Sequence, residues 1–121
     1  MVKKLISLST FLEELNDLLS YSEKVYSFYT KNKKKFVYAK ILFDVNDEIY
    51  NLIKLNITIC PQEFQQDAYD LIFHLDVWRA IWLDEVSLKN PKWSEEFAFS
   101  NEVTFPKKSV ERLLSLRNSK F

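Results

Sequence analysis

Glycine is absent from this 121-residue chain, and cysteine and histidine each occur once. Without glycine, the phosphate-binding loops, dinucleotide-binding turns and nucleophile elbows that need its backbone freedom are not expected. The single Cys60 cannot form an intrachain disulfide, which is typical of a reducing compartment. One histidine and one cysteine are also too few for a zinc site. These absences weigh against nucleotide-dependent and zinc enzymes, and we expect neither a metal nor a cofactor.

Long apolar runs are absent as well. No run approaches the roughly 18 residues needed to cross a bilayer. Acidic residues interrupt the N-terminal segment from Glu13 onward and no small-residue cleavage site follows, so no signal peptide is predicted. We therefore expect a cytoplasmic protein without a membrane segment. The composition, 47% hydrophobic and 28% charged, predicts one globular domain over residues 1–121.

Aromatic residues are abundant, with ten Phe, six Tyr and three Trp. Their rings bury much surface on few rotatable bonds, so they suit a core or a binding surface. The net charge is zero, but residues 24–40 carry six lysines and no acid, whereas residues 61–102 carry nine acids and three bases. This uneven distribution concerns the choice of partner and not the fold.

Three segments predict helices, and each opens with a residue that favours a helix start. Thr10 begins a T-x-x-E capping box before a helix over residues 10–20. Pro61 opens a second helix over residues 61–75, since its missing N–H is not needed at the first helical position. Pro106 opens a third, whose leucines recur at helical spacing.

The remaining segments alternate in polarity and are rich in β-branched and aromatic residues, as strands are. The candidate strands are residues 24–30, 36–44, 48–59, 77–86 and 93–105. They predict an α+β fold, in which the N-terminal helix and two further helices pack on a single antiparallel β-sheet of about five strands. A strand, a proline and an amphipathic helix recur in both halves of the chain. If this recurring pattern is a true internal repeat, the sheet consists of a duplicated ββα unit.

His74 and Cys60 are the candidates for acid–base or nucleophilic chemistry. Asp70 stands four residues before His74 and could orient it, although a surface histidine beside an acid is the commoner arrangement. Cys60 lies at the start of the helix that carries His74, so the helix holds the two far apart. We therefore predict that the chain is not an enzyme and acts by binding.

An acidic segment that contains tryptophan is the candidate partner-binding surface. Its residues are Trp82, Asp84, Glu85, Trp93, Glu95 and Glu96. Tryptophan is enriched in interface hot spots, and carboxylates around it would speed the approach of a basic partner. Neighbouring residues on a strand point to opposite faces, so the adjacent acidic pairs do not predict a metal site. The alternative is that the tryptophans form the core and the acids solvate the surface.

The lysine run of residues 31–35 is the alternative site, for nucleic acid. Its candidate contacts are Tyr29, Lys33, Lys35 and Tyr38. In single-strand binders, bases stack on aromatic rings while lysines follow the phosphates. The zero net charge and the isoelectric point of about 6.6 oppose this interpretation. A nucleic-acid-binding domain is usually basic.

A glycine-free chain of this size, rich in Lys, Asn, Ile and Phe and with these tryptophans and carboxylates, resembles bacterial immunity proteins. The immunity proteins of contact-dependent growth inhibition and of nuclease bacteriocins are of this kind. The resemblance is compositional. It implies a cytoplasmic protein that binds a cognate toxin, with Asp84, Glu85, Glu95 and Glu96 facing the basic cleft of a nuclease. An inhibitor of a host enzyme, from a phage or mobile element, would share this mechanism.

The possible repeat of strand, proline and helix resembles a second class of protein, the Whirly and PUR folds. These folds imply binding of single-stranded nucleic acid across the sheet.

Overall fold

The computed structural model describes residues 6–98 and 104–118, and helices account for 81% of them. In chain order these are α1 (Leu8–Lys31), α2 (Phe36–Asn56), the 3₁₀ turn η1 (Ile57–Ile59), α3 (Gln62–Lys89), α4 (Lys107–Ser115) and the 3₁₀ turn η2 (Leu116–Asn118). The described residues contain no strand, only an isolated bridge between Lys35 and Glu96. The predicted α+β fold with its antiparallel sheet is therefore wrong, and so is the duplicated ββα unit. No helix in this part of the chain is long and apolar enough to cross a membrane.

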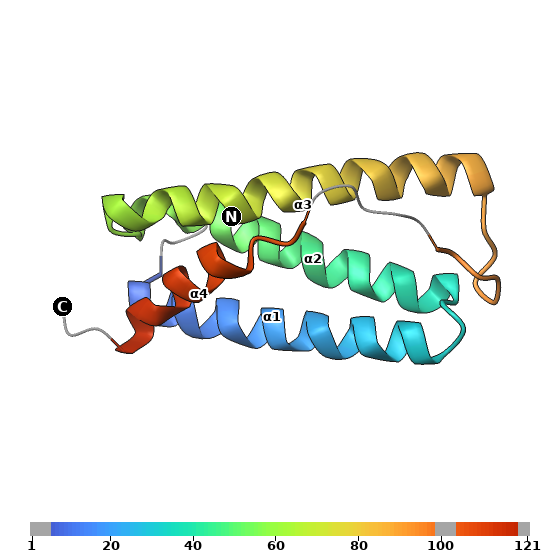
Figure 1. Ribbon diagram of the computed structural model, residues 1–121, viewed down its shortest axis with the longest axis horizontal. Coiled ribbons are helices and arrows are strands. Elements are labelled where there is room, and N and C mark those ends of the chain that lie inside the picture. The colour runs from blue at the N-terminus through green and yellow to red at the C-terminus, as the bar shows by residue number, and fades with distance from the viewer. Residues whose placement is uncertain (1–5, 99–103, 119–121) are drawn as a thin grey trace.

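The three long helices lie side by side, with α2 packed against both α1 and α3 (Figure 1). The short α4 packs against α3 and α1 at the end of the molecule where α1 begins (Figure 1). It has nine residues, against 24 in α1 and 28 in α3. Since a helix rises about 1.5 Å per residue, α1 and α3 extend well beyond it. A fourth helix thus accompanies α1 and α3 over only part of their length.

α2 contains the predicted strand of residues 36–44 and most of the one at residues 48–59, whose last three residues form η1. Apart from the adjacent pair Ile49 and Tyr50, its buried residues recur every three or four positions: Phe36, Ala39, Leu42, Val45, Ile49, Tyr50, Ile53 and Asn56. This is the period of a helix face and not of a strand. Isoleucine and valine suggested strands, but their preference for strands is weak, and burial against α1 and α3 overrides it.

The helix starts at Pro61 and Pro106 are confirmed to within one residue, since each proline stands directly before α3 or α4. The start of α1 differs, because Ser7 is its N-cap and accepts a hydrogen bond from the Thr10 N–H at 3.1 Å. α1 and α3 also continue through the predicted strands that follow them. No strand forms over the described part of the last candidate, and its residues 99–103 lie outside the described residues.

Two hydrophobic clusters form the core. The larger lies where all four helices meet and includes Phe11, Leu15, Ile49, Leu71 and Leu113. The smaller lies toward the opposite end and comprises Tyr29, Phe36, Ala39, Trp82 and Phe97. α4 contributes no residue to the smaller cluster. Phe97, from the segment that follows α3, completes it.

Candidate functional site

The segment that follows α3 is bound to the α1–α2 turn by main-chain hydrogen bonds. The Phe36 N–H donates to the carbonyl of Glu95 at 2.8 Å, and the Phe97 N–H donates to the carbonyl of Lys34 at 2.7 Å. The Tyr29 hydroxyl donates to the Phe97 carbonyl. Burial of this hydroxyl raises the pKa of Tyr29 to about 12. These bonds hold the two connections together as one unit, although they are far apart in sequence.

The surface formed by residues 31–37 and 91–97, called here the turn end, carries a stack of three rings. Trp93 is 58% exposed, and its ring stacks on Phe36 with 5.1 Å between the centroids. Phe36 stacks in turn on the buried Trp82 at 5.8 Å. An exposed indole supported in this way is already ordered, so it loses little conformational freedom when it binds a partner.

The structure brings together half of the predicted partner-binding residues. Trp93, Glu95 and Glu96 lie on the turn end. Trp82 is buried beneath them in the smaller core cluster. Asp84 and Glu85 lie outside this surface, on α3, where Glu85 forms an ion pair with Lys89 at 2.9 Å.

The two glutamates of the turn end lie among lysines. A carboxylate oxygen of Glu95 accepts a hydrogen bond from the Lys92 N–H at 2.9 Å. Glu96 lies opposite Lys35, since the main chains of the two residues form an isolated antiparallel bridge. The five lysines of this surface are Lys31, Lys33, Lys34, Lys35 and Lys92. With five lysines and two glutamates, the turn end is net positive and not the separate acidic surface that the sequence predicts.

The residues predicted to contact nucleic acid are Tyr29, Lys33, Lys35 and Tyr38. The described residues contain no sheet to hold them, so the sheet-based arrangement of this prediction is wrong. Tyr29 is buried, and its ring is not available to stack on a base. Tyr38 packs edge-on against Phe28, with centroids 4.8 Å apart. Lys33 and Lys35 do lie at the turn end, on the same surface as the exposed Trp93.

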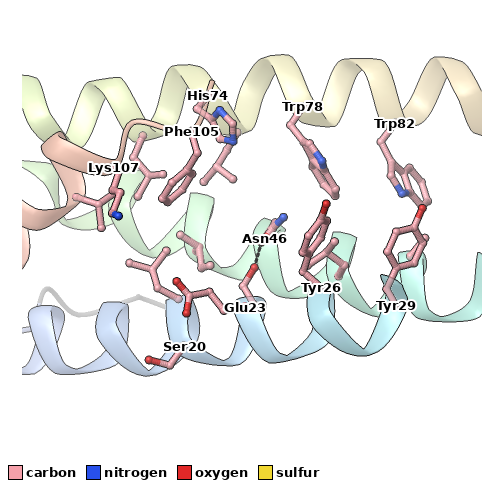
Figure 2. Close-up of a pocket in the computed structure, with 18 of the residues that line it drawn as sticks. Ser20, Glu23, Tyr26, Tyr29, Asn46, His74, Trp78, Trp82, Phe105 and Lys107 are labelled. Carbon is pink, nitrogen blue, oxygen red and sulfur yellow. Dashed lines mark hydrogen bonds between the residues drawn. The ribbon is translucent and has the colours of Figure 1, made fainter. Parts of the chain in front are cut away.

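A second feature is a groove that runs over α2 between α1 and α3 (Figure 2). Its volume is about 840 Å³, and one face of α4 lines part of it. Figure 2 shows Tyr26 of α1 and Trp78 of α3 pointing toward each other across it. Tyr29 and Trp82 form a second such pair nearer the turn end. The spacing of three residues between Tyr26 and Tyr29, and of four between Trp78 and Trp82, places each pair on one face of its own helix. This shared face could have been predicted if both segments had been read as helical.

Several polar side chains line the groove. Asn46 projects from α2, where its Oδ1 accepts a hydrogen bond from the Ser22 hydroxyl at 2.7 Å (Figure 2). His74 Nδ1 and Trp82 Nε1 are buried, and neither has a hydrogen-bond partner among the described residues. A buried polar atom left unpaired costs about 1–3 kcal/mol. These two atoms are therefore places where a bound molecule could gain affinity.

His74 is not the surface histidine that the sequence predicts. It is buried, and its ring lies edge-on to Phe105 with centroids 5.3 Å apart. Burial lowers the pKa of His74 and favours the neutral ring. Asp70, its predicted neighbour, instead accepts hydrogen bonds from Gln66 at 2.9 Å and Ser109 at 2.8 Å.

Cys60 is buried in the larger cluster. Its burial raises the pKa of the thiol, which disfavours the reactive thiolate. Among the residues that the structure describes, no group of three or more His, Cys, Asp or Glu side chains could hold a metal ion.

No protein-family model, curated protein or solved structure matches this chain. Its function is therefore inferred from the turn end and the groove.

Proposed function

We propose that this chain is a non-enzymatic binding protein whose turn end docks onto a partner protein, and that it neutralises a toxin in the manner of an immunity protein. The ring stack of Trp93, Phe36 and Trp82 is the observation that supports docking at this surface. Interfaces concentrate their binding energy on a few large, well-supported side chains, among which tryptophan is enriched. The toxin-neutralising role rests on the compositional resemblance to immunity proteins.

The charges of the turn end describe the complementary surface. Trp93 needs an apolar pocket, and the five lysines around it favour carboxylates at the rim of that pocket. Complementary charges raise the association rate and align the two surfaces. We therefore expect an acidic or mixed contact surface on the toxin, and not the phosphate-binding cleft of a nuclease.

A photo-crosslinking amino acid at position 93 tests the docking surface. In the cells from which the chain comes, p-benzoylphenylalanine in place of Trp93 is expected to form one dominant cross-link to a partner protein. The same amino acid in place of Phe73 is the matched control, because Phe73 is 61% exposed on α3 and lies outside the turn end. Equal cross-linking from both positions would contradict a specific surface.

With the partner identified, alanine substitution measures the contribution of the ring stack. Trp93→Ala is expected to weaken the complex by about 2 kcal/mol or more, which is roughly thirtyfold in the dissociation constant. Phe73→Ala is expected to leave the affinity within about twofold. Unchanged affinity in Trp93→Ala would exclude the turn end as the main contact. Growth protection by the two variants against the partner then tests whether that partner is a toxin.

Single-stranded nucleic acid is a second candidate ligand, because lysines and an exposed aromatic ring share the turn end. Fluorescence anisotropy with a labelled oligo-dT would detect it at low salt. Lys33→Glu combined with Lys34→Glu is expected to abolish such binding, whereas Lys107→Glu combined with Lys108→Glu on α4 serves as the control. Binding that survives reversal at the turn end, or that does not weaken with salt, would remove this candidate.

A further inference from the structure

The groove between α1 and α3 has the size of a small-molecule site and is separate from the exposed Trp93. Its volume of about 840 Å³ falls within the roughly 300–1,000 Å³ of known ligand pockets. We propose that it binds an uncharged aromatic molecule that carries an O–H or N–H group. Lys34 and Trp82 contribute to both the groove and the turn end, but Trp93, the proposed contact for a partner protein, does not line the groove.

The walls of the groove favour an aromatic ring. Tyr26 is 56% exposed, so its ring is available to a ligand. Trp78 points toward it from α3 (Figure 2). The Trp78 ring also stacks on Phe43, with 5.9 Å between the centroids. A flat ring inserted between the two would gain stacking contacts from both sides. A flexible aliphatic chain would gain no such contacts and would lose more conformational freedom.

The charges of the groove favour an uncharged ligand. Its lining contains two acids and two lysines, Glu23, Glu111, Lys34 and Lys107. Glu23 lies on α1, Lys34 in the α1–α2 turn, and Lys107 and Glu111 on α4. Their charges sum to zero, so neither an anion nor a cation meets an excess of opposite charge. Burying an ion without such compensation carries a large desolvation cost.

The polar atoms of the groove specify a hydrogen-bond donor on the ligand. Burial favours the neutral ring of His74, and a hydrogen bond with the Thr104 backbone engages one of its nitrogens. Nδ1 is buried and unpartnered within the described part of the chain, so it offers a lone pair to a ligand O–H or N–H. Asn46 Oδ1 accepts a hydrogen bond from Ser22, and the Asn46 amide N–H groups can donate to the oxygen of a ligand hydroxyl.

The indole N–H signals in a ¹H–¹⁵N spectrum provide the test, because two of the three tryptophans line the groove and Trp93 does not. Each signal is assigned from a Trp→Phe variant, and if one variant fails to fold the other two assign the third by elimination. The probe is 2-naphthol, which carries one hydroxyl and is uncharged at neutral pH. It is expected to shift the Trp78 and Trp82 signals and to leave the Trp93 signal in place.

Three related probes test the ligand class. Naphthalene lacks the donor, 2-naphthoate is an anion and 2-naphthylmethylammonium is a cation. Each is expected to bind at least about tenfold more weakly than 2-naphthol, as the loss of one good hydrogen bond or the burial of one charge requires. Equal affinity of any of the three probes, or shifts confined to Trp93, would overturn the proposal. So would the absence of any shift at Trp78 and Trp82 with millimolar 2-naphthol.

Two substitutions on α1 locate the site. Tyr26→Ala removes one wall, and a roughly tenfold weaker dissociation constant is expected for 2-naphthol. Tyr21→Ala is the matched control, because Tyr21 is 51% exposed on the same helix and does not line the groove. Both rings are solvent-exposed, so both variants should fold. An equal loss of affinity in the two variants, or no loss in Tyr26→Ala, would contradict a ligand between Tyr26 and Trp78.

Discussion

Glycine at the α1–α2 turn is expected to stabilise this protein, although the natural chain contains none. Lys33 and Lys34 have φ angles of 61° and 51°, which place both in the left-handed region. That conformation costs a residue with a Cβ about 1–2 kcal/mol, whereas glycine adopts it without a clash. Glycine also gives the unfolded chain more freedom, which offsets about 0.5–1 kcal/mol of the gain. Each of Lys33→Gly and Lys34→Gly should therefore raise the free energy of unfolding by about 0.5–1 kcal/mol.

The other interactions of the turn should survive these substitutions. The Lys34 N–H donates to the Tyr29 carbonyl at 2.9 Å, and the Lys34 carbonyl accepts from the Phe97 N–H at 2.7 Å. Both are main-chain bonds that glycine retains, and the side chains of Lys33 and Lys34 are exposed. The double variant is therefore expected to gain about 1–2 kcal/mol. For a domain of this size that is an increase in melting temperature of roughly 4–8 °C.

Urea and thermal denaturation followed by circular dichroism measure the effect. Lys24→Gly is the matched control, because Lys24 is exposed within α1, where a glycine costs about 1 kcal/mol. The same substitution should thus stabilise the turn and destabilise the helix. If Lys33→Gly and Lys34→Gly lower the stability as Lys24→Gly does, the two lysines do not occupy a left-handed turn.

Three further predictions concern buried residues. Phe97→Ala empties a fully buried site in the smaller cluster and should lower the free energy of unfolding by about 3–5 kcal/mol in urea; a loss below about 1 kcal/mol would contradict this packing. Burial lowers the pKa of His74 below its usual 6.5, so the unfolded chain binds the proton more readily. Stability should be fullest above pH 6.5 and fall on acidification, and His74→Gln should reduce the difference in unfolding free energy between pH 7.5 and 5.5, measured in urea. An unchanged difference would contradict a lowered pKa of His74. A thiol reagent should modify Cys60 only on unfolding, because the thiol is buried and its pKa is raised; rapid reaction of the folded protein would oppose this.

The sequence contained a signal for the length of α3 that the predicted strand at residues 77–86 overlooked. Trp78 and Trp82 share a face in a strand and also in a helix, because a separation of four residues fits both periods. Leu71 and Leu75 extend the helical pattern backward from them. No proline or glycine interrupts residues 62–89, so nothing marks the turn that a helix ending at residue 75 would need before a strand. Continuity of the helix was therefore the simpler interpretation.

The groove was beyond prediction for a different reason. Pro106 correctly indicates where α4 begins, but the groove depends on how far α1 and α3 extend past that short helix. The helices predicted from the sequence end at residues 20 and 75, so they do not extend past α4 and do not form the groove. The alignment of Tyr26 with Trp78 also depends on the relative positions of two helices that both pack on α2, which no local pattern in the sequence encodes.

The charge pattern along the sequence predicted a separate acidic surface, and this was wrong because helix lengths determine which charged residues lie side by side. α1 and α2 have 24 and 21 residues and so span about 36 and 32 Å, and their connecting turn places the lysine run at one end of the molecule. α3 has 28 residues, about 42 Å, which is enough to return the chain along the full length of α2 to that same end. Glu95 and Glu96 therefore lie beside lysines that precede them by some 60 positions. An acidic segment and a basic segment thus form one mixed surface. Of the two tryptophans predicted to contact a partner, Trp93 is exposed on it and Trp82 is buried beneath it.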